Sequence, residues 1–146
     1  MTMKQSIILA AGLLFSGLTY AQDIPVKEVP SVVLNSFNKA FPQALKVDWE
    51  KKGALFNADF DLGRREHEVW LNHKGAIVKH KKELRARELP SVIANSIKKN
   101  FKGFRIDDVD KYEEEKQFFY KVELKTLSEE KKVVFDAHGK ISNRIL

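Results

Sequence analysis

Four histidines are the residues of this chain whose type most directly suggests chemistry. His67, His73, His80 and His138 could in principle bind a metal or transfer protons. None of them stands at the i, i+4 helical spacing, with Asp or Glu in company, that metal-binding motifs show. We therefore expect solvated or turn histidines and no metal ligands among them.

Six carboxylates alternate along the chain in a way that places them on one polar sheet face: Asp48, Glu50, Asp59, Asp61, Glu66 and Glu68. A general acid–base pair needs one carboxylate in a dry environment and one in a wet environment, and an open sheet face does not obviously supply the dry one. Neighbouring Lys and Arg make cross-strand ion pairs the simpler interpretation. Cation binding is the alternative. It would require several of these carboxylate oxygens to converge on one point.

Nucleophiles are no better placed. The chain has no cysteine, which excludes a thiol nucleophile, disulfides and a zinc–thiolate site. Its helical serines lack a His or Lys base in a recognisable motif, and no Gly-rich phosphate loop occurs. These serines are Ser31, Ser36, Ser91 and Ser96. The sequence therefore predicts no catalytic residues, no cofactor and a protein that is not an enzyme.

Large apolar residues on the polar side of the predicted strands are more informative. Trp70, Phe119 and Val134 each alternate with core-facing residues, so they should point away from the core. Exposed aromatic residues on a polar sheet are typical of partner-binding anchors. The alternative is that the connector or the other half of the chain covers them. The predicted partner-binding residues are Trp70, Phe119, Val134, Asp59 and Glu68.

An internal repeat defines the elements that must position these residues. Residues 28–41 read EVPSVVLNSFNKAF and residues 88–101 read ELPSVIANSIKKNF, 60 positions later, with eight of 14 positions identical. Each segment predicts a short helix with Pro30 or Pro90 at its first position. Apolar residues at i, i+4 and i+8 form one stripe per helix, with Val33 and Ile93 as equivalent members. The repeat predicts two copies of one structural unit.

Strands follow each helix. Residues 54–62 and 118–125 alternate between apolar and other side chains, as half-buried antiparallel strands do. Two hairpin loops each gain two residues in the second repeat, and even insertions keep the core-facing side unchanged. We predict an α+β fold of two tandem units, residues 24–82 and 83–146, each with one helix on a four-stranded antiparallel meander. The units could lie side by side or share one sheet.

The N-terminus resembles an export signal. Ser6–Leu18 is an apolar run of 13 residues, and Thr19 and Ala21 are small residues at the −3 and −1 positions. The run is too short for a membrane span, so we predict a signal peptide of residues 1–21 and a periplasmic or secreted protein. The net charge of +6 is spread evenly rather than in a stripe, which argues against a nucleic-acid partner.

Five short motifs recur in a fixed order along the two units: Val29-Pro30, Val47–Glu50, Asn72–Gly75, Leu89-Pro90 and Asp136–Gly139. Their order over residues 24–146 resembles the PepSY-like, beta-lactamase-inhibitor-like family of exported bacterial proteins. The second unit departs from the pattern, because Ile106–Val109 stands where the first unit has the Trp-containing motif Val47–Glu50. The resemblance implies an exported, non-enzymatic module with a sheet face for another protein; related domains are associated with inhibition of hydrolases.

Two functions are consistent with these observations. The first is an exported, non-enzymatic protein-binding module, an inhibitor or accessory factor of a periplasmic or secreted hydrolase, with an unidentified protein partner and no membrane span after signal cleavage. The second is a periplasmic module that binds a small ligand or cation on the acidic face of the first sheet. The sequence names no target.

Overall fold

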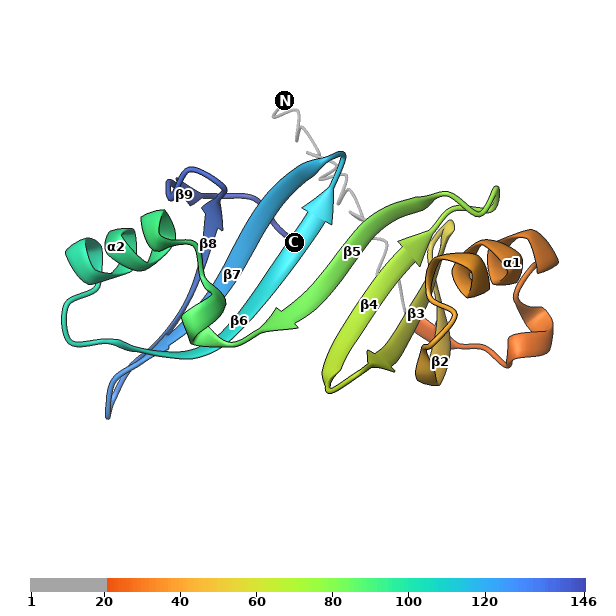
Figure 1. Ribbon diagram of the computed structural model, residues 1–146, viewed down its shortest axis with the longest axis horizontal. Helices are drawn as coiled ribbons and strands as arrows, with labels where there is room; N and C mark the ends of the chain where they lie inside the picture. Colours follow the sequence, from red (N-terminus) through yellow and green to blue (C-terminus); the bar gives the residue numbers. More distant parts are fainter. Residues whose placement is uncertain (1–20) are drawn as a thin grey trace, which may run out of the picture.

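The computed structural model describes residues 21–146, which form a nine-stranded antiparallel sheet with two α-helices (Figure 1). The helices are α1 (Ser31–Ala40) and α2 (Ser91–Asn100), and each follows a short 3-10 turn, η1 (Val26–Glu28) or η2 (Ala86–Glu88). The strands are β1 (Ala21–Asp23), β2 (Leu45–Lys52), β3 (Leu55–Leu62), β4 (Arg65–Leu71), β5 (Ile77–Leu84), β6 (Arg105–Glu114), β7 (Gln117–Lys125), β8 (Glu130–Asp136) and β9 (Ile141–Ser142).

The strands pair in sequence order from β1 to β9, and every neighbouring pair is antiparallel. Strand β5 of the first repeat pairs directly with β6 of the second, so the two repeats share one continuous sheet. The α+β class is therefore confirmed. The expectation of two four-stranded meanders is corrected, because β1 adds a ninth strand beside β2.

Both helices turn their apolar stripes toward the sheet as predicted. Val33 and Ile93 are each 0% exposed. Pro30 and Pro90 lie one residue earlier than predicted, at the N-cap, because their backbones are extended, with ψ of 140° and 138°. Because the helices are only 10 residues long, their stability depends on this packing against the sheet.

The two helices cover the same face of the sheet, one at each end (Figure 1). Cross-strand partners point to the same face, and the register pairs Val69 with His80 and Leu84 with Val109, which carries one face continuously through β5. Beneath the helices lie two separate apolar cores, one containing the predicted core residue Trp49 and the other Phe135.

Strand β5, between the two cores, contains no fully buried residue. The middle of the sheet is therefore held by the backbone ladder and by polar side chains rather than by an apolar core. The predicted boundary between residues 82 and 83 falls inside β5. The division into residues 24–82 and 83–146 remains a prediction.

Equivalent glycine turns bring the β4–β5 and β8–β9 loops onto the helices. Gly75 and Gly139 have φ of 82° and 80°, a conformation that glycine adopts without the steric cost of a side chain. A Cβ atom at Gly139 would lie 2.9 Å from the carbonyl oxygen of Val92 in α2. The close approach explains why both repeats carry glycine there.

The predicted signal peptide, residues 1–21, lies outside the described residues except for Ala21, which begins β1. Within residues 21–146, neither helix has the length and apolar character needed to cross a bilayer.

Candidate functional site: the open face of the sheet

The side of the sheet opposite α1 and α2 is here called the open face. Its central row runs from β3 to β8 through cross-strand pairs: Asp59 with Glu68, Glu68 with Lys81, Lys81 with Tyr112, Tyr112 with Phe119, and Phe119 with Asp136. Trp70 and Val134 share this face, opposite Lys79 and Lys121. The structure therefore brings all five predicted partner-binding residues to one face.

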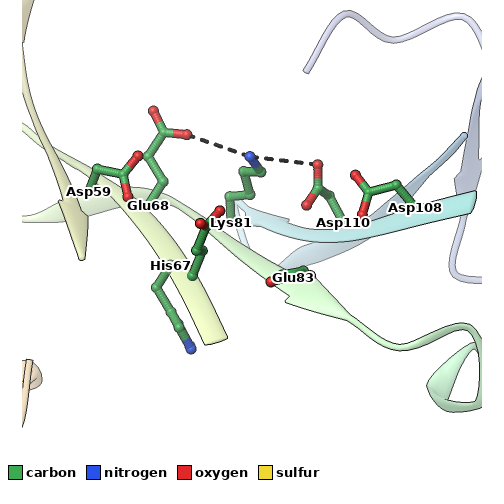
Figure 2. A pocket seen from close by; sticks show the side chains of 8 residues that line it. Asp59, His67, Glu68, Lys81, Glu83, Asp108 and Asp110 are labelled. Atoms are coloured by element: carbon green, nitrogen blue, oxygen red, sulfur yellow. Dashed lines mark ion pairs between the residues drawn. The ribbon is translucent and has the colours of Figure 1, made fainter. Parts of the chain in front are cut away.

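A cavity of about 120 Å³, here called the acidic pocket, lies in the middle of the open face. Figure 2 shows Lys81 of β5 reaching between Glu68 of the first repeat and Asp110 of the second. The Lys81 ammonium is 4.0 Å from a Glu68 oxygen and 3.6 Å from an Asp110 oxygen. The lining residues are Asp59, Glu66, His67, Glu68, Lys81, Glu83, Asp108 and Asp110.

Negative charge dominates the acidic pocket. Burial is the main cause of a raised pKa for Asp59, and the neighbouring carboxylates of Glu68 and Glu66 raise it further. Burial also raises the pKa of Asp110, although Lys81 opposes the shift. Both carboxylates are thus held in surroundings that disfavour their negative charge, so a positive group added to the pocket would be stabilised.

Beside the acidic pocket, positive groups and aromatic rings form a row across the open face. The Lys79 ammonium lies 4.8 Å from the ring centre of Trp70 and 5.2 Å from that of Tyr112. These distances are within the range of cation–π attraction. The row, here called the cation–aromatic ladder, comprises Lys52, Trp70, Lys79, Tyr112, Phe119 and Arg144.

Phe119 occupies the predicted face but is not exposed there. Only 7% of its surface is accessible, because Tyr112 lies beside it and the Arg144 guanidinium lies 4.6 Å from its ring centre. Trp70 and Val134 are half-buried. Of the two alternatives for Phe119, exposure and cover, the structure shows cover, and this cover comes partly from the C-terminal tail rather than from the connector or the other half of the chain. The role of these residues in binding remains a proposal.

Ion pairs are present for three of the six carboxylates. Lys46 of β2 lies 2.9 Å from Asp61 of β3, whereas Lys52 lies 3.0 Å from Glu68 of β4 and 3.1 Å from Glu50 in its own strand. Within residues 21–146, the other three carboxylates, Asp48, Asp59 and Glu66, lie within 4.0 Å of no Lys, Arg or His nitrogen. Asp59, Glu66 and Glu68 line the acidic pocket, whereas the other three lie outside it. The carboxylates thus do not form a single cluster.

Two histidines depart from the prediction. His67 and His80 project toward the helix side, and Nδ1 of His67 lies 2.9 Å from Nε2 of His80. His67 is only 6% exposed, and burial is the main reason that its pKa falls to about 4. The expectation of solvated histidines is wrong for this pair. His73 and His138 lie exposed in turns, as expected.

Metal binding has no ready-made site in residues 21–146. This part of the chain contains no group of three or more His, Cys, Asp or Glu side chains arranged to hold an ion. The acidic pocket is organised around an ammonium group instead.

Sequence reasoning missed Tyr112, Lys81 and Arg144. Tyr112 lies three positions after the core residue Val109, and alternation therefore places it on the open face. A β-bulge between Ile106 and Asp108 obscures this alternation in the sequence. Lys81 is one of several lysines in β5, a strand without an apolar pattern. Arg144 follows the last strand, where the sequence carries no periodic signal.

Comparison with known families identifies the relationship. A family model, provisionally described as beta-lactamase-inhibitor-like and PepSY-like, matches residues 19–62 and 54–143. The chain belongs to this PepSY-like family. The two matched segments overlap at residues 54–62 and together span both repeats, which agrees with the predicted resemblance. No curated protein matches the chain.

Several solved structures share the fold of this PepSY-like protein. A BLIP-like protein of Bacteroides fragilis is 22% identical with a TM-score of 0.68, covering 82% of this chain and 85% of that one. A DUF2874 family protein of Bacteroides uniformis is 21% identical with a TM-score of 0.69, covering 77% and 85%. A Bacteroides eggerthii protein, provisionally described as periplasmic, is 18% identical with a TM-score of 0.70, covering 77% and 85%. At these identities the likeness shows the fold alone.

Proposed function

We propose that this PepSY-like protein is an exported, non-enzymatic module that binds another protein through its open face, as an inhibitor or accessory factor of a periplasmic or secreted hydrolase. The observation that carries the proposal is the partly accessible ring of Trp70 beside the acidic pocket, on a face that neither helix covers. The largely covered rings of Tyr112 and Phe119 continue the aromatic row from it. Aromatic residues within a polar rim are typical of the centres of protein interfaces.

Membership of a beta-lactamase-inhibitor-like family supports the binding function, and it names no target. The signal-like N-terminus, with the provisional description of one fold relative as periplasmic, supports export. The absence of a nucleophile–base arrangement in the sequence supports a non-enzymatic role.

A matched pair of variants tests the proposed face. Trp70→Ala with Tyr112→Ala removes two aromatic rings from the open face, whereas Phe118→Ala removes a ring from the opposite side of the neighbouring strand. A protein captured from a periplasmic extract is purified, and its affinity for each variant is measured by calorimetry. We expect the double variant to bind at least about tenfold more weakly and Phe118→Ala to bind as the wild type does.

Equal affinity of all three proteins would contradict binding through the open face. An enzyme assay of the captured partner, with and without the PepSY-like protein, then separates an inhibitor from an accessory factor. A partner whose hydrolase activity does not change would argue against inhibition.

The acidic pocket favours a second candidate, a module that binds a cation or a small cationic ligand. Its lining has an excess of carboxylates over the single ammonium of Lys81. Calorimetry with Ca²⁺ and Mg²⁺, on the wild type and on Asp59→Asn with Glu68→Gln, tests this function. Binding heat that disappears in the variant supports it, and no heat or thermal shift at roughly millimolar ion rules it out.

A further inference from the structure

The C-terminal tail, residues 143–146, places one side chain against the open face. The Arg144 guanidinium lies 2.9 Å from a Glu114 carboxylate oxygen and 4.6 Å from the ring centre of Phe119. The next residue, Ile145, is 96% exposed. Arg144, rather than an apolar contact of Ile145, therefore attaches this part of the tail to the sheet.

The surface that receives Arg144, here called the arginine site, combines two complementary groups. The Phe119 ring comes from β7 and the Glu114 carboxylate from β6, and Tyr112 continues the aromatic surface beside them. A flat ring and a neighbouring carboxylate match the two recognition modes of a guanidinium, which stacks on aromatic faces and donates hydrogen bonds to carboxylates.

Arg144 differs from the other cations of the ladder in how it is held. Lys52 and Lys79 project from strands β2 and β5 within the sheet, so backbone hydrogen bonds hold their main chain in place and only their side chains can turn away from the rings. Arg144 lies two residues beyond the short strand β9. It is therefore the cation of the ladder whose backbone, as well as its side chain, can move away while the sheet stays intact.

We propose that Arg144 occupies, within the same chain, the place of an arginine that a protein partner presents, so that the tail is a displaceable cover of the arginine site. The proposal rests on the proposed function and adds the chemistry of the partner, a segment that carries an exposed arginine. The adjacent acidic pocket favours a partner that is basic around that arginine.

Displacement has a clear quantitative consequence. A tethered group competes at an effective concentration that is roughly millimolar for a short flexible link. An external arginine must overcome this competition in the full chain, and it meets none when the tail is removed. Removal of the tail should therefore strengthen binding of an arginine-bearing segment without changing the sheet.

The test uses a chain that ends at Ser142 and a five-residue peptide, SNRIL, which matches residues 142–146. Binding is followed by NMR through the amide shifts of Tyr112, Glu114 and Phe119. We expect saturable shifts in the shortened chain, binding at least about fivefold weaker in the full chain, and none with the control peptide SNQIL. Glu114→Gln in the shortened chain should weaken binding of SNRIL.

Full-length Arg144→Gln serves as the second variant if the shortened chain does not fold. It should bind SNRIL with the affinity expected for the shortened chain, at least about fivefold more tightly than the full wild-type chain does. Equal binding of SNRIL and SNQIL, or no binding to either tail variant, overturns the arginine site. This assay needs no natural partner, so its failure leaves binding through the open face standing. With a captured partner, the tail variants should bind more tightly than the wild type, and equal affinity overturns displacement.

Discussion

The guanidinium of Arg65 lies 2.7 Å from the carboxylate of Glu88, and this ion pair joins strand β4 of the first repeat to the η2 turn of the second. The other carboxylate oxygen of Glu88 accepts a hydrogen bond of 2.8 Å from the backbone N–H of Arg85. Glu88 therefore fixes the start of the second repeat both to its own backbone and to the neighbouring repeat.

Neutralising Glu88 should change the acid stability of the protein. The hydrogen bond from Arg65 is the main reason that the pKa of Glu88 falls to about 2. A carboxylate with a lowered pKa stabilises the fold above its unfolded pKa, and this stabilisation disappears as the pH falls from about 4.5 to about 2. Urea unfolding across this range should show a weaker pH dependence for Glu88→Gln than for the wild type.

Glu28→Gln is the matched control, because Glu28 is the equivalent residue of the first repeat and makes no ion pair within residues 21–146. An NMR titration of the Glu88 carboxyl group gives a direct reading. A midpoint near 4.5 would contradict the pairing with Arg65 in solution.

The contact between His67 and His80 predicts a second, milder pH effect. Burial lowers the pKa of both imidazoles, and the positive charge of Lys82 lowers both further. Arg65 also lowers the pKa of His67, and Lys111 that of His80. These two histidines therefore bind protons more readily in the unfolded chain than in the folded protein. Their contribution to the free energy of unfolding is fully present above about pH 6.5 and is lost as the pH falls toward about 4.

The His67→Gln, His80→Gln double variant should lose less stability than the wild type between about pH 7.5 and pH 4.5. Denaturant unfolding at both pH values measures the difference. His73→Gln, in an exposed turn, should behave as the wild type. An NMR midpoint of 6.5 for His67 would contradict the buried contact.

Glycine substitutions should separate backbone strain from crowding. Gly139→Ala places a Cβ atom 2.9 Å from the Val92 carbonyl oxygen, whereas the same change at Gly63 meets nothing within 4 Å. Both residues have positive φ, which costs roughly 1–2 kcal/mol for alanine. We expect this loss for Gly63→Ala and a larger loss, of about 2–4 kcal/mol, for Gly139→Ala.

Urea unfolding of the two glycine variants measures both losses. If the two losses were equal, the turn after β8 would not pack closely against α2.

Lys81 should couple the two repeats. Lys81→Met leaves Asp110 buried without its cation, at a cost of about 1–3 kcal/mol. Asp110→Asn should recover part of that loss in the double variant, because it removes the unpaired charge. A double-mutant cycle from denaturant unfolding gives the coupling energy, and additive losses would exclude a coupling between these two residues.

Sequence alternation predicted the faces of the strands because the core-facing positions recur every second residue, as Phe56, Ala58 and Phe60 do. The repeat likewise predicted the equivalent burial of Val33 and Ile93. The joining of the repeats through β5 was not predictable, since β5 contains no fully buried residue, touches a core only through the half-buried Leu84, and pairs with β6 through its backbone.

Residues of the candidate site were predictable only where they belonged to an alternating strand. Trp70 and Phe119 were found in this way. The sequence left open whether Phe119 is covered, and it did not indicate the cover by Arg144, which lies 25 residues further along the chain in a segment without periodicity. The contact between His67 and His80 depends on the register of β4 against β5, which local sequence does not specify.

The joining of β5 to β6 raises the question of what limits further strand pairing at the two outer edges of the sheet that residues 21–146 form. An uncovered edge strand would expose unpaired backbone N–H and C=O groups, which could pair with a strand of another molecule and lead to end-to-end polymers. Strand β1, of three residues, occupies part of the free side of β2, and β9, of two residues, occupies part of the free side of β8. β1 pairs with residues 50–52 and β9 with Val134 and Phe135, so each terminal strand shortens the continuous backbone that its edge offers to an incoming strand. The protein thus uses edge pairing for its own assembly while restricting the same pairing with other molecules.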